Sequence, residues 1–208
     1  MKFYSGSYIF PFQWDQVATT YWQKYSLHKS KHIISEDVLS RKIIEGKLFT
    51  KRLINKSNNS AEKVVNMLFH TRAKKTWVIE ESIVDPVAKT MITYTRNIGY
   101  KDLAVVEEKC VYKESAEKSD EVIQMKKAWI YSNHFYLGRI IQNLVYQKFK
   151  LRANKSSSEF HSVLTKLFNM ELVDPTNNSG FVPLLKDQDI KGKAIRATKS
   201  VAHKTPKL

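Results

Sequence analysis

Six extended segments follow one another through the middle of the chain, and no crossover helix separates them. The six segments are Ile33–Ile43, Lys47–Asn55, Lys74–Asp85, Thr90–Ile98, Ala104–Lys113 and Glu121–Ser132. Glu45-Gly46 and Pro86 lie where hairpin turns are needed, and an aromatic-rich segment, Lys2–Ile9, precedes the six. Parallel strands need long crossover connections, whereas antiparallel strands are joined by short turns. The order of segments therefore predicts an α+β protein with an antiparallel sheet of about seven strands.

Two further segments have the spacing of apolar residues that is typical of amphipathic helices. They are Gln13–Tyr25, with an unusually aromatic face, and His134–Phe168, which makes about nine turns. In the longer segment, Lys148, Arg152 and Lys155 share the face that carries apolar residues before and after them. Burying bare charge costs several kcal/mol for each ion. This part of the helix therefore either extends into solvent or faces a cavity that holds a negatively charged ligand.

A second group of basic residues, Lys51, Arg52 and Lys56, lies at the end of the predicted Lys47–Asn55 strand. Strand alternation predicts that one of Arg52 and Lys56 points toward the interior. The segment that follows, Ser57–Arg72, is predicted to be a mobile loop that holds one short helix with an apolar face. Its apolar residues are Val64, Val65, Met67, Leu68 and Phe69. Basic residues beside an apolar loop suit a molecule with a phosphate head group and fatty tails, and an ordinary run of surface charge is the alternative.

The composition narrows the class of protein. With 35 Lys and Arg against 20 Asp and Glu, the 208 residues carry a formal net charge of +15, which attracts nucleic acid, acidic lipid or an acidic protein. Cys110 is the only cysteine, so an internal disulfide is excluded, and its place in a predicted strand favours a packed side chain over a nucleophile. The sequence has no paired metal-ligand spacing, no phosphate-binding glycine motif and no G-x-S-x-G. We therefore expect no metal, no cofactor and no enzymatic activity.

The character of the chain changes near its C-terminal end. No stretch approaches the roughly 18 apolar residues needed to cross a bilayer, and the first residues do not resemble a signal peptide. After Asn169 the sequence becomes rich in proline, glycine and basic residues. We expect residues 1–172 to fold as one domain and residues 173–208 to form a flexible basic tail.

Several stretches of the sequence resemble the PRELI domain family. The matching stretches are WDQVATTYWQKY (14–25), KHIISEDVLSRKI (31–43), GKLFTKRLINKS (46–57), ESIVDPVAKTMITYTRNI (81–98), VVEEKCVY (105–112) and QKFKLRANKSSSEFHSVLTKLF (147–168). The patterns SxVDPxxxTMxTxTRN and VEExxVY within them are the most specific. The resemblance covers residues 1 to about 170, and the chain is identified as a member of this family.

The resemblance implies a curved sheet closed by a long C-terminal helix and shorter helices around a lipid cavity, similar to START and phosphatidylinositol-transfer proteins. It implies transfer of phosphatidic acid or phosphatidylserine from the outer to the inner mitochondrial membrane, through the intermembrane space. The stretches TYTRNI and EEKCVY and the end of the long helix resemble the phosphatidic-acid subgroup more closely, so we expect phosphatidic acid as the cargo, in support of cardiolipin synthesis. It also implies a heterodimer with a small helical twin Cys-x9-Cys protein and contact with anionic membranes. The Ser57–Arg72 loop would act as a lid over the cavity mouth.

The resemblance also assigns a set of basic residues to lipid binding. They are Lys24, His32, Arg52, Lys56, Lys148 and Lys155. Arg152, which stands where relatives commonly have a polar amide, is added to the predicted head-group set. The chain departs from the family after the first helix, where KYSLH (24–28) replaces Arg-Tyr-Pro-Asn-Pro. Lysine lacks the bidentate fork of arginine, which puts the usual role of Lys24 in doubt.

Three alternatives stay open at this point. Phosphatidylserine is the rival cargo for the same fold. Its serine would need an acidic or amide partner in the cavity, and Arg152 favours phosphatidic acid instead. A basic nucleic-acid-binding protein is compatible with the charge and the aromatic content, although no RRM-like stacking motif is present. The last alternative is an adaptor that binds the small helical protein and transfers nothing.

Overall fold

The computed structural model describes residues 1–27, 33–57 and 75–168. Met1–Leu164 form one compact unit, which contains the sheet and nearly all of the described helical residues. The elements are β1 (Lys2–Phe10), α1 (Trp14–Thr20), η1 (Tyr21–Gln23), α2 (Lys24–Leu27), β2 (Ile33–Ile44), β3 (Lys47–Ser57), β4 (Lys75–Asp85), β5 (Thr90–Asn97), β6 (Val105–Glu114), β7 (Val122–Tyr131) and α4 (Gly138–Phe168).

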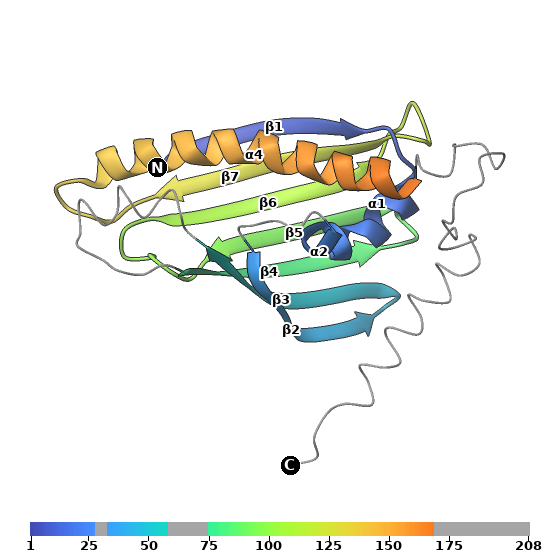
Figure 1. The fold of residues 1–208 in the computed structure, drawn as a ribbon, viewed down its shortest axis with the longest axis horizontal. Helices are drawn as coiled ribbons and strands as arrows, with labels where there is room; N and C mark the ends of the chain where they lie inside the picture. The colour runs from blue at the N-terminus through green and yellow to red at the C-terminus, as the bar shows by residue number, and fades with distance from the viewer. Residues whose placement is uncertain (28–32, 58–74, 169–208) are drawn as a thin grey trace, which may run out of the picture. The chain divides into compact units, whose positions relative to one another are not determined.

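The seven strands form one curved sheet in the order β1-β7-β6-β5-β4-β3-β2 (Figure 1). Every neighbouring pair is antiparallel. All strands but the first are thus adjacent to the strand that precedes or follows them in sequence, as short connections require. The predicted antiparallel sheet of about seven strands, closed by a long C-terminal helix, is confirmed.

Local turn chemistry explains two of the hairpins. Glu45 and Gly46 have φ values of 49° and 74°, the pair of positive angles that a tight two-residue turn between β2 and β3 requires. At the turn between β4 and β5, the Asp85 Oδ1 accepts hydrogen bonds from the backbone N–H groups of Val87 and Ala88 at 3.1 and 2.9 Å. Both turns lie where the sequence predicts them.

The strand β2 forms one edge of the sheet and is irregular. Its pairing with β3 shifts register twice, between Ile33 and Ser35 and again between Val38 and Ser40. Several of its apolar side chains are exposed, among them Ile43 and Ile44. Extra residues at such shifts bend a strand and interrupt its ladder of hydrogen bonds.

The predicted Gln13–Tyr25 helix is divided into three short consecutive helices, because η1 tightens the chain between α1 and α2. Its aromatic face is buried as expected: Trp14 and Tyr21 are core residues. The ring of Tyr21 lies 5.7 Å from that of Tyr112 on β6 and 6.2 Å from that of Phe160 on α4. Aromatic contacts therefore join the short helices to both the sheet and the long helix.

The helix α4 packs against β7 and β1 through small residues. The Lys126 ammonium of β7 donates to the backbone oxygen of Ala153 at 3.3 Å, and the Ser157 hydroxyl donates to Gln124 Oε1 at 2.6 Å. The helix begins at Gly138, four residues later than the spacing indicates, so Phe135 lies in the preceding turn and is exposed. Ile140 is also exposed. The predicted start of this helix at His134 is therefore wrong by four residues.

Candidate functional site: a cationic cavity

A cavity of about 380 Å³ lies between the sheet and the helices. This volume is within the range of pockets that hold small organic ligands. Alternate residues along the first half of β4, the second half of β5 and most of β6 line it, since side chains alternate between the two faces of a strand. The opposite wall is α4, with Ile141, Val145 and Phe149 among its lining residues, and Tyr21 and Tyr25 complete it. Most of the surface that the cavity offers is therefore apolar.

The charged side chains of the cavity wall are mostly basic. Five cations line it, and they come from four elements: Lys24 from α2, Lys56 from β3, Lys126 from β7, and Lys148 and Arg152 from α4. Glu80 and Glu108 are the two acids among the described lining residues. Charges interact strongly where water is excluded, so this surplus of cations favours an anionic ligand.

Burial disfavours the charge of three of these lysines. It lowers the pKa of Lys24 to about 8, although Glu80 offsets part of the effect. Burial likewise lowers the pKa of Lys56, and partial burial together with the neighbouring Arg152 lowers that of Lys148. A phosphate placed among them would favour their charged forms and remove part of this cost.

Arg52 does not line the cavity but lies behind its wall. Its side chain is only 1% exposed; its Nε donates to Glu80 Oε1 at 2.7 Å, and its Nη1 pairs with Glu36. The Nζ of Lys24 lies 4.0 Å from the other oxygen of Glu80. Burial alone would raise the pKa of Glu80, but Lys24 and Arg52 outweigh it and hold that pKa below its usual value. Glu80 is therefore the shared counter-ion of two buried cations.

Aromatic rings surround the same two cations. The Nζ of Lys24 lies 3.6 Å from the centre of the Tyr21 ring. The Arg52 guanidinium carbon lies 5.2 Å from Tyr21, 5.1 Å from Trp22 and 5.7 Å from Tyr25. Cations held over ring faces are attracted by the quadrupole of the ring, and this attraction strengthens as water is removed. The short helices thus fix the position of Lys24 at the cavity wall.

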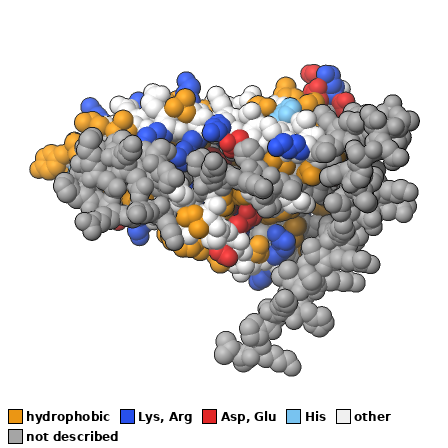
Figure 2. Space-filling view, viewed as in Figure 1, with side chains coloured by type: hydrophobic (Ala, Val, Ile, Leu, Met, Phe, Trp, Pro, Cys, Tyr) orange, Lys and Arg blue, Asp and Glu red, His pale blue; other side chains and the backbone are white. Residues whose placement is uncertain are grey.

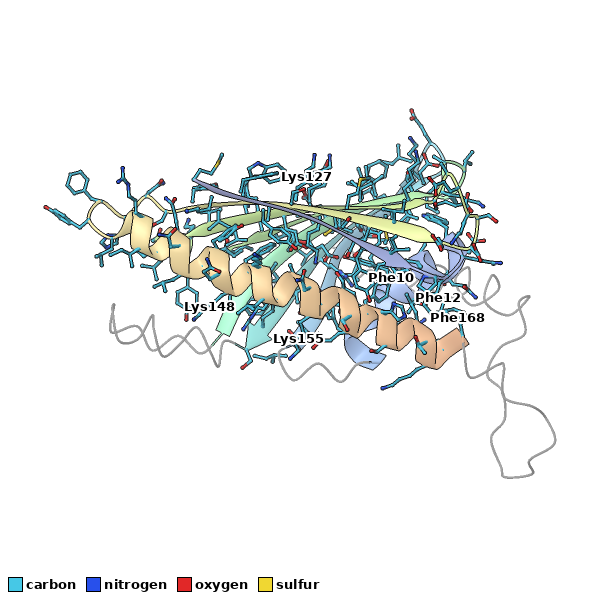
Figure 3. The ribbon with its side chains drawn as sticks, turned by 90° about the horizontal axis from the view of Figure 1, so that it is seen from above. Phe10, Phe12, Lys127, Lys148, Lys155 and Phe168 are labelled. Carbon is cyan, nitrogen blue, oxygen red and sulfur yellow. The ribbon has the colours of Figure 1, made fainter. Side chains whose placement is uncertain are left out.

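The helical repeat explains which basic residues of α4 face the cavity. Leu144, Lys148, Arg152 and Ser156 line it at intervals of four residues. Lys155 does not line it; its side chain is 67% exposed, and its Nζ lies 3.7 Å from Glu159. Figure 3 labels Lys148 and Lys155 on the same long helix. The predicted cationic face is therefore present for two of its three members.

Other predicted site residues have different outcomes. Arg52, Ile54 and Lys56 all point inward, because residues two and four positions apart along a strand lie on the same face. The expectation that one of Arg52 and Lys56 points inward is therefore corrected, since both do. His32 lies outside the described residues. The same holds for the predicted lid residues Val64, Val65, Met67, Leu68 and Phe69.

Sequence reasoning missed one basic residue of the cavity wall, Lys126. Lys126 belongs to a Lys-Lys pair of β7, whose alternation sends Lys126 inward while Lys127 points to the face away from α4 (Figure 3). Of the neighbouring Glu80 and Glu81, Glu80 is buried and Glu81 is exposed, as the alternation of side chains along β4 requires. Glu80 lies in the middle of β4, where Arg52 neutralises its charge.

Two further observations concern chemistry. Cys110 is buried, and burial raises the pKa of its thiol, so it is a packed side chain as predicted. Among the described residues, no cluster of three or more His, Cys, Asp or Glu is placed to hold a metal ion.

None of the described helices combines the length and the apolar character needed to cross a membrane.

Comparisons with known proteins agree with this architecture. Residues 15–171 match the sequence profile of the PRELI-like family. "PRELI domain-containing protein 1, mitochondrial" of Homo sapiens is 34% identical over 168 residues, which cover 80% of this chain and 77% of that protein. Among solved structures, TTHA0849 from Thermus thermophilus aligns with a TM-score of 0.52 at 13% identity, over 80% of this chain and 99% of that one.

Dicamba monooxygenase also aligns, with a TM-score of 0.50 at 5% identity, over 98% of this chain and 61% of that one. The fold, a curved antiparallel sheet with a long C-terminal helix, is thus shared with proteins of very different sequence, one of which is a monooxygenase. Family membership is decided by sequence, since the profile covers most of the chain and the human protein shares about a third of its residues. The chain belongs to the PRELI-like family.

Proposed function

We propose that this protein is a non-enzymatic carrier that moves phosphatidic acid between the outer and inner mitochondrial membranes. The observation that carries the proposal is a mainly apolar cavity whose described lining residues include five cations and two acids. A mitochondrial location is supported by relatives with "mitochondrial" in their names. Work in the intermembrane space and supply of lipid to cardiolipin synthesis belong to the same proposal.

The phosphate of the lipid sits among Lys24, Lys56, Lys148 and Arg152, and the acyl chains lie along the apolar wall. Each buried methylene contributes about 0.8 kcal/mol, so the chains supply most of the binding free energy. The cations supply selectivity, because only an anionic head group compensates for the charge already buried there.

The remaining predicted residues take indirect roles in this proposal. Arg52 positions Lys24 through their shared counter-ion Glu80 and does not itself touch the phosphate. Lys155, which is exposed on α4, contacts head groups at the membrane surface. His32 and the apolar Ser57–Arg72 segment contribute to the mouth and the lid. A small helical twin Cys-x9-Cys protein binds the carrier as its heterodimer partner, which co-purification of the two chains would test.

Phosphatidylserine is the second candidate cargo, and one observation favours it. Glu108 lines the cavity and supplies the acidic partner that a serine ammonium needs. Asn97 also lines it, but its amide is engaged: it donates to the backbone oxygens of Gly99 and Ala104 and accepts from Val106 N–H. Among the described lining residues, Glu108 is therefore the group suited to recognise serine, although its Oε1 also accepts from the Cys110 thiol at 3.1 Å, while five cations are suited to recognise phosphate.

A vesicle-to-vesicle transfer assay with each lipid, with and without the partner protein, tests the proposal. Arg152→Glu reverses a charge of the cavity wall, and we expect it to reduce transfer of phosphatidic acid at least tenfold. Lys150→Glu is the matched control, since it makes the same change in net charge on an exposed face of the same helix. Equal transfer by the two variants would contradict the head-group site. Faster transfer of phosphatidylserine by the wild type would reverse the order of cargoes.

Organic extraction of the purified protein separates the carrier from the other classes of function. A carrier should release phospholipid that mass spectrometry identifies. An adaptor should release none and still bind the small helical protein. Abundant bound nucleic acid without lipid would instead favour a nucleic-acid-binding protein.

A further inference from the structure

One end of the sheet collects the connections that surround the mouth of the cavity. β3 ends at Ser57 opposite the first residue of β4, and β5 ends at Asn97 beside Val78 near the start of β4. The start of β6 lies beside the end of β7, because Val105 pairs with Tyr131. Ser57 and the loop after β5 line the cavity. We call this the mouth end, made of the starts of β1, β4 and β6 and the ends of β3, β5 and β7.

The turn between β7 and α4 carries two aromatic side chains into solvent at the mouth end. Phe135 is 89% exposed and Tyr136 is 85% exposed, and their ring centres are 4.9 Å apart in an edge-to-face contact. Ile140, in the first turn of α4, is exposed beside them in sequence. Figure 2 shows hydrophobic atoms gathered at the end of the molecule where α4 begins. Two aromatic rings left in water forgo the free energy that their burial would contribute.

Hydrogen bonds hold the backbone of this turn in place. The Gly138 N–H donates to the backbone oxygen of His134 at 2.9 Å, and the Leu137 N–H donates to His134 Nδ1 at 3.3 Å. The Ile141 N–H donates to the Leu137 oxygen at 2.9 Å and begins the helix. The aromatic pair is therefore presented on a fixed support rather than on a loose end.

Charge at the mouth end is complementary to an anionic surface. Among the described residues of its loops and strand starts, Lys2, Lys101 and Arg139 are exposed cations, and Asp102 is an exposed acid. Aromatic rings settle at the level of lipid head groups, and neighbouring cations add electrostatic attraction to acidic lipids. This combination of groups lies at the same end of the sheet as the cavity-lining residues Ser57, Tyr100 and Leu103.

We propose that Phe135 and Tyr136 form an insertion tip that seats the mouth of the cavity on an anionic bilayer. The tip enters the head-group layer, Lys101 and Arg139 contact lipid phosphates beside it, and the opening lined by Tyr100 and Leu103 faces the membrane. The location of the mouth rests on the proposed function. Binding to the bilayer surface can nevertheless be measured without any transfer of cargo.

The test is co-sedimentation of the full chain with phosphatidylcholine vesicles that contain phosphatidylglycerol, an anionic lipid other than the proposed cargoes. We expect the double variant Phe135→Ser, Tyr136→Ser to weaken vesicle binding about tenfold or more, because two aromatic side chains no longer enter the head-group layer. Phe135→Trp with Tyr136→Trp should bind as well as the wild type. Val87→Ser is the control: Val87 is 92% exposed in the β4–β5 turn, at the other end of those strands, and its loss should change nothing.

Three outcomes would overturn the insertion tip. In the first, the double serine variant binds vesicles as well as the wild type. In the second, Val87→Ser loses as much vesicle binding as the double serine variant. In the third, the double serine variant loses self-association or a protein partner but keeps its vesicle binding. Failure of the cavity proposal has a different signature. A wild type that transfers no lipid, while the double serine variant still loses vesicle binding, would refute the carrier and support the tip.

Discussion

Lys24 illustrates how a single side chain links the core to the cavity. It contacts the Tyr21 ring, faces Glu80 and lines the cavity, so its charge is balanced between burial and one shared counter-ion. Because burial lowers the pKa of Lys24 to about 8, Lys24 loses its positive charge near pH 8 when the cavity is empty. A bound phosphate favours the protonated form, so affinity is greatest below that pH and falls as the pH rises through it.

We therefore expect binding of phosphatidic acid to weaken between about pH 7 and pH 9. Lys24→Arg is the informative comparison, because arginine stays charged over this range. Equilibrium binding of a fluorescent phosphatidic acid, measured for both proteins, should show a steeper loss in the wild type. Parallel curves would mean that Lys24 does not interact with the phosphate.

Glu80 and Glu81 provide a prediction about stability at the same scale. Glu80→Gln leaves Lys24 and Arg52 without their shared counter-ion, and removal of one partner from a buried ion pair costs about 3–5 kcal/mol. Glu81→Gln removes only the exposed ion pair with Lys51, which contributes less than about 1 kcal/mol. Urea denaturation of the two variants should separate them by at least about 2 kcal/mol. A smaller difference would show that the Arg52–Glu36 pair alone satisfies this part of the core.

At the scale of elements, the aromatic residues of α4 anchor the helix to the rest of the unit. The Phe160 ring lies 5.3 Å from that of Phe10 on β1 and 6.4 Å from that of Tyr112 on β6. Phe160→Ala should lower the free energy of unfolding by about 3–5 kcal/mol, because it opens a cavity in this cluster. Leu151→Ala, on an exposed face of the same helix, should change it by less than about 0.5 kcal/mol. Thermal or urea unfolding of both variants would measure the contrast.

The elements themselves could be predicted from the sequence because their signals are local. Alternating residues and turn chemistry at Glu45-Gly46 and Pro86 place the strands within a few residues of their observed bounds. The spacing predicts the start of α4 too early, because Phe135 fits the apolar pattern although the helix has not begun. The role of Glu80 as a shared counter-ion could not be predicted from local patterns, since Glu80, Lys24 and Arg52 belong to three different elements. The inward position of Lys126 could have been found from the alternation of β7.

At the scale of the whole molecule, the domain boundary remains a prediction. Met1–Leu164 form a compact unit, and we expect a chain that ends at residue 172 to unfold cooperatively at nearly the temperature of the full chain. The basic residues beyond it should matter only for attraction to anionic membranes, an effect that added salt screens. Differential scanning calorimetry and vesicle binding at two salt concentrations would test both expectations. A large loss of thermal stability would place part of the folding unit beyond residue 172.

The two register shifts in β2 have a consequence for a protein with an open sheet. A straight edge strand with exposed isoleucines would invite the edge of another copy to join it, and the sheets would grow into aggregates. The shifts bend β2 and break its regular ladder, so that a second edge cannot align along its length. The sheet can thus remain open and curve around a cavity, while its irregular edge disfavours pairing with the edge of a second copy.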